Sequence, residues 1–176
     1  EAMAILTKKS SIRLIVIDEF QNRDRQFVYR YVQGGFLVQS PDNDVVIDDQ
    51  LQVATKRAPE LKEKNDLEFA FGISKHVKSN AIVLVKDGQA IGVGAGQMSR
   101  VEAVEIALKK AGDKACGAVV GSDAFFPFKD SIDQLAKAGV TAVIQPGGSK
   151  RDQESVDACD DHNISMVFTH MRHFKH

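Results

Sequence analysis

The fold of this chain is decided by the stretch Ala81-Ile82-Val83-Leu84-Val85-Lys86-Asp87-Gly88-Gln89-Ala90-Ile91-Gly92-Val93. Its first five residues are all apolar and predict a buried strand, and the run from Ala90 to Val93 predicts a second strand. The pair Asp87-Gly88 between the two runs is a strong turn signal. We therefore expect an antiparallel hairpin across residues 81–93.

Strand and helix signals alternate from this hairpin toward the C-terminus. Ser99 and Glu102 have the spacing of a capping box, which predicts the start of a helix, and Gly112 predicts its end. Further strands are predicted at 118–120, 141–144 and 164–168, with helices near 130–138 and 150–161. This alternation is typical of an α/β layer with parallel strands, here joined to the antiparallel hairpin.

The N-terminal third has less regular signals. Residues 1–9 are expected to end a helix, and short strands are expected at 12–17, 27–32, 35–39 and 45–47. Pro59 can open a helix at its first turn, and apolar residues then recur at helical spacing to about Lys78.

Composition excludes several classes of protein. The 176 residues suit one ordinary domain, or one large domain with an extra lobe. The net charge of -1 gives no global field that would recruit nucleic acid or an anionic membrane. No apolar run approaches the roughly 20 residues that a membrane span needs, and no signal-peptide pattern is present. Cys116 and Cys159 lack metal-binding spacing, which fits reduced thiols in a cytoplasmic protein.

Ligands of open α/β sheets bind beyond the carboxyl ends of the strands. Four segments of unusual composition are expected at such positions, and three of them can converge if their strands are neighbours. They are Lys78-Ser79-Asn80, the loop 121–130, the turn Gln145-Pro146-Gly147-Gly148-Ser149 and the run Met171-Arg172-His173-Phe174-Lys175-His176.

The loop 121–130 has both a functional and a structural interpretation. Phe125, Phe126 and Phe128 either plug the sheet or line a pocket for a flat ligand. Asp123 and Asp130 offer carboxylates to an amine or a cation, or they are solvated or cap a helix.

The other two C-terminal segments each have two interpretations as well. The turn 146–149 either exposes amide donors to an anion or is only a turn. In the final run, Arg172 suits a phosphate or a carboxylate and Phe174 suits a planar base, whereas the alternative is a solvated basic tail.

Three further patterns are not expected to carry chemistry. The run Gly92-Val93-Gly94-Ala95-Gly96 lacks the third glycine of a dinucleotide fingerprint and follows a hairpin. Lys75-His76 lies late in a helix, where basic residues favour the helix dipole. His170 and His173 have no carboxylate or thiol at ligand spacing, so metal catalysis is not expected.

Six segments, in order, carry a resemblance to a known family. They are Asp66-Leu67-Glu68-Phe69-Ala70, Lys75-His76-Val77-Lys78-Ser79-Asn80-Ala81-Ile82-Val83, Gly92-Val93-Gly94-Ala95-Gly96-Gln97-Met98-Ser99-Arg100, Ser122-Asp123-Ala124-Phe125-Phe126-Pro127-Phe128, Ile144-Gln145-Pro146-Gly147-Gly148-Ser149 and Arg172-His173-Phe174. They resemble the C-terminal part of the bifunctional purine biosynthesis proteins, which combine AICAR transformylase with IMP cyclohydrolase. The resemblance covers most of the chain and is dense from about Thr55.

The resemblance implies a three-layer α/β/α fold of the cytidine-deaminase-like kind with a mixed sheet, although the zinc pattern of the deaminases is absent. It implies that residues 1–57 are a lead-in segment, with the end of a preceding lobe and a linker, and that residues 58–176 form the C-terminal lobe. Family members form homodimers with active sites across the interface. The Lys-His pair that transfers protons lies in the preceding lobe, and Lys75-His76 is not its counterpart.

The implied reaction transfers the formyl group of 10-formyltetrahydrofolate to AICAR ribotide in purine (IMP) biosynthesis. The chain is then a C-terminal fragment of the formyltransferase, inactive alone, from a parent that is also an IMP cyclohydrolase. The alternative is a non-catalytic nucleotide-binding or dimerisation module of the same fold. A deaminase of this fold is a second rival and would require zinc.

The resemblance also implies roles for single residues. Asn80 is the catalytic amide near the reacting carboxamide. Arg172 grips the 5′-phosphate, Phe174 packs on the imidazole base, and Phe125 lies at the same pocket of the substrate. The folate site is implied at Pro127, Phe128, Asp130, Gly147, Gly148 and Ser149. Asp123, with the backbone near Lys175, is a candidate for a structural monovalent cation.

Overall fold

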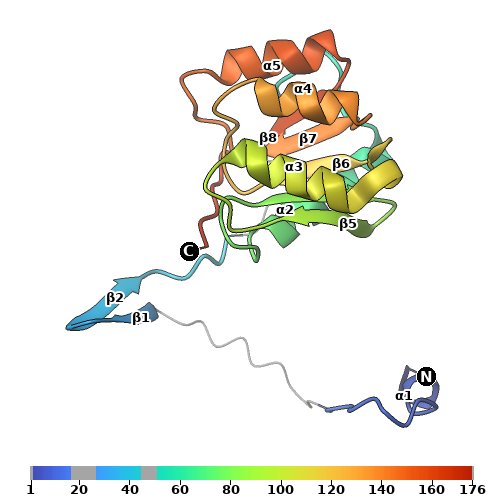
Figure 1. Ribbon diagram of the computed structural model, residues 1–176, viewed down its shortest axis with the longest axis vertical. Helices are drawn as coiled ribbons and strands as arrows, with labels where there is room; N and C mark the ends of the chain where they lie inside the picture. Colours follow the sequence, from blue (N-terminus) through green and yellow to red (C-terminus); the bar gives the residue numbers. More distant parts are fainter. Residues whose placement is uncertain (1, 17–26, 45–50, 176) are drawn as a thin grey trace. The chain divides into compact units, whose positions relative to one another are not determined.

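The computed structural model describes residues 2–16, 27–44 and 51–175, and the chain divides into two compact units at residues 1–42 and 43–176 (Figure 1). We call them the small unit and the large unit. None of the described helices is long and apolar enough to cross a membrane.

The small unit contains the helix α1 (Ala2–Leu6) and a hairpin of strands β1 (Val28–Val32) and β2 (Gly35–Gln39). Tyr31 lies opposite Phe36, and Gly34 in the turn has a φ of +88°, which favours glycine. The predicted helix and both strands are confirmed. The strand predicted at 12–17 is wrong for residues 12–16, because no described strand pairs with them. Residue 17 and the strand predicted at 45–47 lie outside the described residues.

The large unit is built on a six-stranded mixed sheet with the order β3-β8-β7-β6-β4-β5. Its strands are β3 (Gln52–Val53), β4 (Ile82–Lys86), β5 (Gln89–Gly94), β6 (Val119–Ser122), β7 (Ala142–Gln145) and β8 (Ser165–Phe168). Strands β6, β7 and β8 are parallel, whereas β4 is antiparallel to both β5 and β6. The predicted hairpin and parallel layer are therefore confirmed. Strand β3 is too short to give a sequence pattern and was not predicted.

Helices cover both faces of this sheet (Figure 1). Helix α2 (Leu61–Ser74) packs on one face, and α3 (Arg100–Ala111), α4 (Asp130–Lys137) and α5 (Asp152–Asp161) pack on the other. Along β4, Val83 and Val85 join the core under α2, while Ile82 and Leu84 join the opposite core. Burial on both faces explains why this strand is apolar throughout. The expected three-layer α/β/α arrangement with a mixed sheet is confirmed.

The start and the packing of α3 follow from the sequence. The amide of Glu102 donates to the Ser99 hydroxyl and the amide of Ser99 donates to the Glu102 carboxylate, so the capping box is confirmed. A Cβ at Gly94 would run into the carbonyl oxygen of Ala103, so only glycine lets α3 approach β5 this closely. The glycine run 92–96 therefore has a packing role.

The large unit begins before the lobe boundary expected at residue 58. The Thr55 hydroxyl accepts the amide of Met166 at 2.8 Å, and Arg57 donates two hydrogen bonds of 2.9 Å to Glu63 in α2. Residues 51–57 therefore pack with the large unit. The division into a lead-in of 1–57 and a lobe of 58–176 stays a prediction about the parent protein.

Candidate functional site

The topology brings the predicted segments to one edge of the sheet. The carboxyl ends of the parallel strands β6, β7 and β8 meet there, and the antiparallel β4 begins there, with Ile82 opposite Ser122. A cavity of about 450 Å³ opens at this edge. Its lining includes seven of the residues singled out from the sequence, namely Asn80, Phe125, Pro127, Phe128, Asp130, Arg172 and Phe174.

The side-chain amide of Asn80 is held at both ends. Its Oδ1 accepts a hydrogen bond of 2.8 Å from Arg100 Nη2, and its Nδ2 donates one of 3.0 Å to the carbonyl of Gln97. Turning the amide over would place its NH2 group against the Arg100 guanidinium and its oxygen against the Gln97 carbonyl oxygen. The second N–H of Nδ2 is therefore the group that Asn80 can offer to a ligand.

Arg100 lies behind Asn80 and is part of a buried network. Its Nη1 donates to the Ser122 hydroxyl at 2.7 Å and to Asp123 Oδ1 at 2.6 Å. The side chains of Arg100 and Asp123 are only 5% and 1% exposed. Asp123 Oδ1 also accepts the amide of Ala81, whereas its Oδ2 is buried without a hydrogen-bond partner among the described residues.

The aromatic loop combines its two expected roles. Phe126 is fully buried in the core, and its amide donates to the side-chain oxygen of Gln145 at 2.9 Å. Phe125 and Phe128 line the cavity instead, and Phe128 is half exposed. Asp130 is the first residue of α4 and accepts the amide of Ser131, so it does not occupy the N-cap position.

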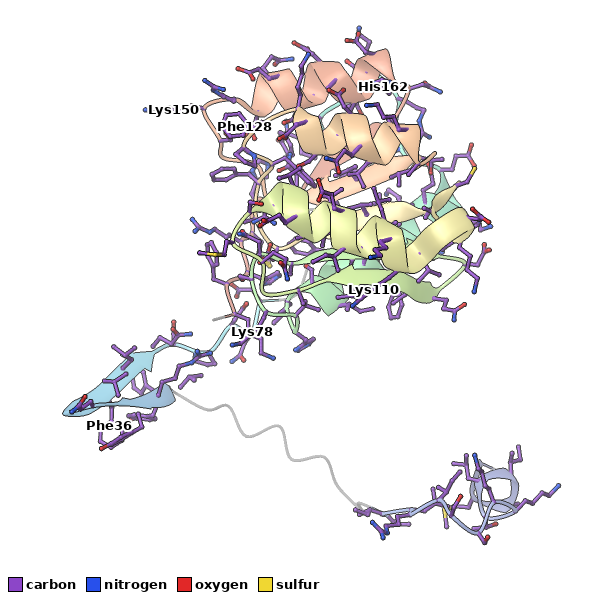
Figure 2. All side chains as sticks on the ribbon, in the orientation of Figure 1. Phe36, Lys78, Lys110, Phe128, Lys150 and His162 are labelled. Carbon is purple, nitrogen blue, oxygen red and sulfur yellow. The ribbon has the colours of Figure 1, made fainter. Side chains whose placement is uncertain are left out.

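The turn 146–149 differs from its expected form. The amides of Gly148 and Ser149 donate to the Asp152 carboxylate at 2.7 and 3.0 Å. The expectation that this turn exposes free amide donors to an anion is therefore wrong for these two groups. Gly147, Gly148 and Ser149 are not among the residues that line the cavity. The neighbouring Arg151 guanidinium lies 5.1 Å from the centre of the Phe128 ring, and Figure 2 shows Phe128 next to the loop of Lys150.

The C-terminal run is fixed to the large unit through residue 175. The amide of His173 donates to the carbonyl of Asp123 at 3.0 Å, and the carbonyl of Lys175 accepts the amide of Ser79 at 2.8 Å. His173 is buried against Phe71, with their ring centres 4.8 Å apart. The alternative of a solvated basic tail therefore holds only in part, because residues 173 and 175 are hydrogen-bonded to the large unit and His173 is buried, whereas the side chains of Arg172 and Lys175 are exposed. Arg172 and Phe174 line the cavity, and the guanidinium lies 3.7 Å from the centre of the Phe174 ring.

The sequence did not single out Arg100, Met98, Ser99, Val101, Ala124 and Ser131 as site residues, although all of them line the cavity. For Arg100 a signal was available. It directly follows the N-cap Ser99, where the positive end of the helix dipole disfavours a cation. An arginine in that position indicates a nearby carboxylate.

The Lys75-His76 pair has structural partners. Lys75 Nζ donates to the carbonyl of Asp44 at 2.7 Å, and the carbonyl of His76 accepts Lys175 Nζ at 2.9 Å. Within the described part of the chain, no three His, Cys, Asp or Glu side chains gather in a way that could hold a metal ion.

Comparisons with known proteins give the family of the chain. The model of the AICARFT/IMPCHase bienzyme family matches residues 1–110. The bifunctional purine biosynthesis protein PurH of Oceanobacillus iheyensis is 53% identical over 176 residues, and that of Aquifex aeolicus is 51% identical over 179 residues. Each match covers 100% of this chain and 34% of the relative, so the chain spans about a third of the length of these relatives.

Among solved structures, a RibD of Acinetobacter baumannii is 22% identical with a TM-score of 0.43, and the match covers 59% of this chain and 33% of that one. A deaminase/reductase of Thermotoga maritima is also 22% identical, with a TM-score of 0.41 and coverage of 61% and 35%. The sequence relationships decide the assignment. This chain belongs to the AICARFT/IMPCHase bienzyme family.

Proposed function

We propose that this chain forms the C-terminal, ligand-binding part of an AICAR formyltransferase in purine (IMP) biosynthesis, within a parent that is also an IMP cyclohydrolase. The observation that carries the proposal is the convergence of Asn80, Arg172, Phe174 and the aromatic loop on one cavity of about 450 Å³. That volume lies within the range of small-molecule sites.

The groups around the cavity suit AICAR ribotide, which has a phosphate, a flat ring and a carboxamide. The Arg172 guanidinium can donate two parallel hydrogen bonds to the 5′-phosphate. The rings of Phe174 and Phe125 offer apolar faces to the imidazole. Asn80 offers an N–H donor, which suits a carbonyl oxygen of a reactant.

In the proposed reaction, the 5-amino nitrogen of AICAR ribotide attacks the formyl carbon of 10-formyltetrahydrofolate. A bond forms between the 5-amino nitrogen and the formyl carbon, and the bond between the formyl carbon and N10 of the folate breaks. A proton moves from the 5-amino nitrogen to N10. Negative charge develops on the formyl oxygen in between, and preorganised donors stabilise it. Asn80 is a donor of this kind among the residues that line the cavity.

The folate is proposed to bind along Pro127, Phe128 and Asp130. The Phe128 ring suits the flat pteridine, and the Asp130 carboxylate can accept hydrogen bonds from its amino groups. Gly147, Gly148 and Ser149 are proposed to border the same ligand, close to Arg151, whose guanidinium lies 5.1 Å from the centre of the Phe128 ring. A monovalent cation beside Asp123 is also proposed, supported by the buried oxygen Oδ2, which has no hydrogen-bond partner among the described residues.

The general base is proposed to lie in the part of the family's length that this chain does not span. The isolated chain is then inactive, and complete active sites form across the interface of a homodimer in the cytoplasm. A non-catalytic module of the same fold would bind the nucleotide without this reaction.

Calorimetric titration of the chain with AICAR ribotide tests the binding part of the proposal. Ribose 5-phosphate and AICAR riboside serve as matched partial ligands, because each lacks one of the two recognised groups. We expect the ribotide to bind at least about 10-fold more tightly than either, since a charge-assisted pair contributes about 1.5–3 kcal/mol. Equal binding of the ribotide and the riboside would contradict the role of Arg172.

A further inference from the structure

Asp123 joins the segments that carry the polar groups of the cavity. Its amide donates to the carbonyl of Ala81 at 3.3 Å, and its Oδ1 accepts the amide of Ala81 at 3.1 Å. Its carbonyl accepts the amide of His173 at 3.0 Å, and Oδ1 also accepts Arg100 Nη1 at 2.6 Å. Asp123 is thus bonded to the start of β4, the start of α3 and the C-terminal run.

The position of Arg100 requires this carboxylate. A cation in the first turn of α3 faces the positive end of the helix dipole, and a buried guanidinium loses its hydration. Asp123 supplies the opposite charge, while Ser122 and Asn80 accept further N–H groups. A buried ion pair adds little net stability compared with apolar side chains of similar size. Its place at the wall of a cavity points to a role in that cavity.

The network determines how Asn80 faces a ligand. Arg100 Nη2 and the Gln97 carbonyl fix the orientation of the Asn80 amide, and this leaves one N–H as the donor that can face the cavity. If Arg100 moved, Asn80 would lose one of the two contacts that keep its amide from turning over, and the Gln97 carbonyl alone would then hold it. Asp123 does not itself line the cavity, so any effect on a ligand passes through the groups bonded to it, and Arg100 is the one among them that lines the cavity.

We propose that Asp123 is a positioning residue for formyl transfer. Its carboxylate holds Arg100, and Arg100 holds the Asn80 amide as a hydrogen-bond donor toward the reacting oxygen. The inference rests on the proposed function and adds a residue that contacts neither substrate.

The test compares Asp123→Asn, Arg100→Met and the double variant in the full-length enzyme that contains this chain. We expect Asp123→Asn to lower kcat on the order of 10- to 100-fold, with the KM for AICAR ribotide changed by less than about 3-fold. Each single variant leaves one buried charge unpaired, so each should lower the melting temperature. The double variant removes both charges and should regain melting temperature but not kcat.

This divergence separates positioning from a structural role. A structural role predicts that kcat returns together with stability in the double variant, and that result would overturn the inference. Because Asp123 is expected to act only through Arg100, the double variant should have the kcat of Arg100→Met alone. Additive losses would also overturn it.

Two controls complete the experiment. Asp66→Asn removes a buried carboxylate outside the cavity, where it accepts the amides of Asp87 and Gly88, and it should change kcat by less than about 3-fold. Excess KCl should not restore Asp123→Asn, since restoration would show that the carboxylate acts through a bound cation instead. Wild-type enzyme without formyl transfer would refute the proposed function itself, whereas an active wild type with an unaffected Asp123→Asn variant would refute only the positioning role.

Discussion

At the residue scale, Arg172 and Phe174 share one contact, because the guanidinium lies 3.7 Å from the centre of the ring. The proposed phosphate contact requires a planar fork, which lysine cannot reproduce. We predict that Arg172→Lys weakens binding of AICAR ribotide by about 10-fold or more and leaves the riboside within about 3-fold. Titration calorimetry with both ligands measures this difference. A parallel loss for both ligands would show that Arg172 does not read the phosphate.

The two cysteines lie in opposite environments, which gives a second prediction at this scale. Burial, together with the nearby Asp160 carboxylate, raises the pKa of the Cys159 thiol to about 12, whereas Cys116 is exposed. Because this pKa lies far above neutral pH, the Cys159 thiol stays protonated there. The thiolate is the reactive species, so Cys159 is unreactive in the folded protein. We predict that iodoacetamide labels native protein at Cys116 and reaches Cys159 only after unfolding. Peptide mass mapping shows the labelled site, and rapid labelling of native Cys159 would contradict its burial.

At the element scale, Arg57 attaches the segment 51–57 to the large unit. It donates to Glu63 in α2 and to the backbone carbonyls of Asn163 and Thr141. Burial by itself raises the pKa of Glu63, but hydrogen bonds from Arg57 and Thr141 outweigh it, so the pKa lies below its ordinary value of 4.5.

This lowered pKa fixes the sign of a pH effect. The ionised form is favoured in the folded state, so Glu63 stabilises the fold above pH 4.5 and loses that contribution as the pH falls through the folded pKa. We predict that Glu63→Gln lowers the free energy of unfolding at pH 7 by about 1–3 kcal/mol and flattens its decline in acid. Urea unfolding at a series of pH values tests this. Identical pH profiles for wild type and variant would contradict it.

The close approach of α3 to β5 gives another prediction at the element scale. We predict that Gly94→Ala destabilises the protein by at least about 2 kcal/mol, because the new methyl group meets the Ala103 carbonyl. Gly72 in α2 is the matched control, since a Cβ there meets nothing within 4 Å. Gly72→Ala should gain about 0.5–1 kcal/mol through helix propensity. Thermal unfolding compares them, and equal effects would contradict the packing role of Gly94.

At the scale of the whole molecule, the small unit exposes large apolar side chains. Tyr31 is 78% exposed and Phe36 is 65% exposed, although they lie opposite each other in the hairpin. A two-stranded hairpin gains little stability alone, so such side chains favour a covering partner. We predict that the chain self-associates above its 19.3 kDa mass, and that Tyr31→Ser with Phe36→Ser reduces this. Light scattering across a concentration series measures it, and a monomer throughout would contradict the prediction.

The sequence predicted most of the molecule wherever a pattern had a local physical cause. The capping box of Ser99 and the alternation of strands and helices from residue 81 onward depend on neighbouring residues, and both are confirmed. Strand β3 depends on a distant pairing with β8, which no local pattern encodes.

Some features of the candidate site could be predicted from the sequence, and others could not. The convergence of Asn80, the aromatic loop and Arg172 follows from strand order, so it could be anticipated. The Arg100–Asp123 pair joins residues 23 positions apart in the sequence. The Asp152 carboxylate accepts hydrogen bonds from the amides of Gly148 and Ser149, which lie close to it in the sequence. Both interactions depend on side-chain geometry, which the sequence does not give. Only the unfavourable position of Arg100 at the start of its helix indicated the Arg100–Asp123 pair.

The central claim is that this chain supplies ligand-binding groups for formyl transfer but not the general base. The measurement that tests it most directly is transfer of the formyl group from 10-formyltetrahydrofolate to AICAR ribotide, by the isolated chain and by the full-length protein that contains it. We predict activity in the full-length protein and none in the isolated chain. Activity in the isolated chain would contradict the proposed position of the base, and inactivity in both would favour a non-catalytic nucleotide-binding module.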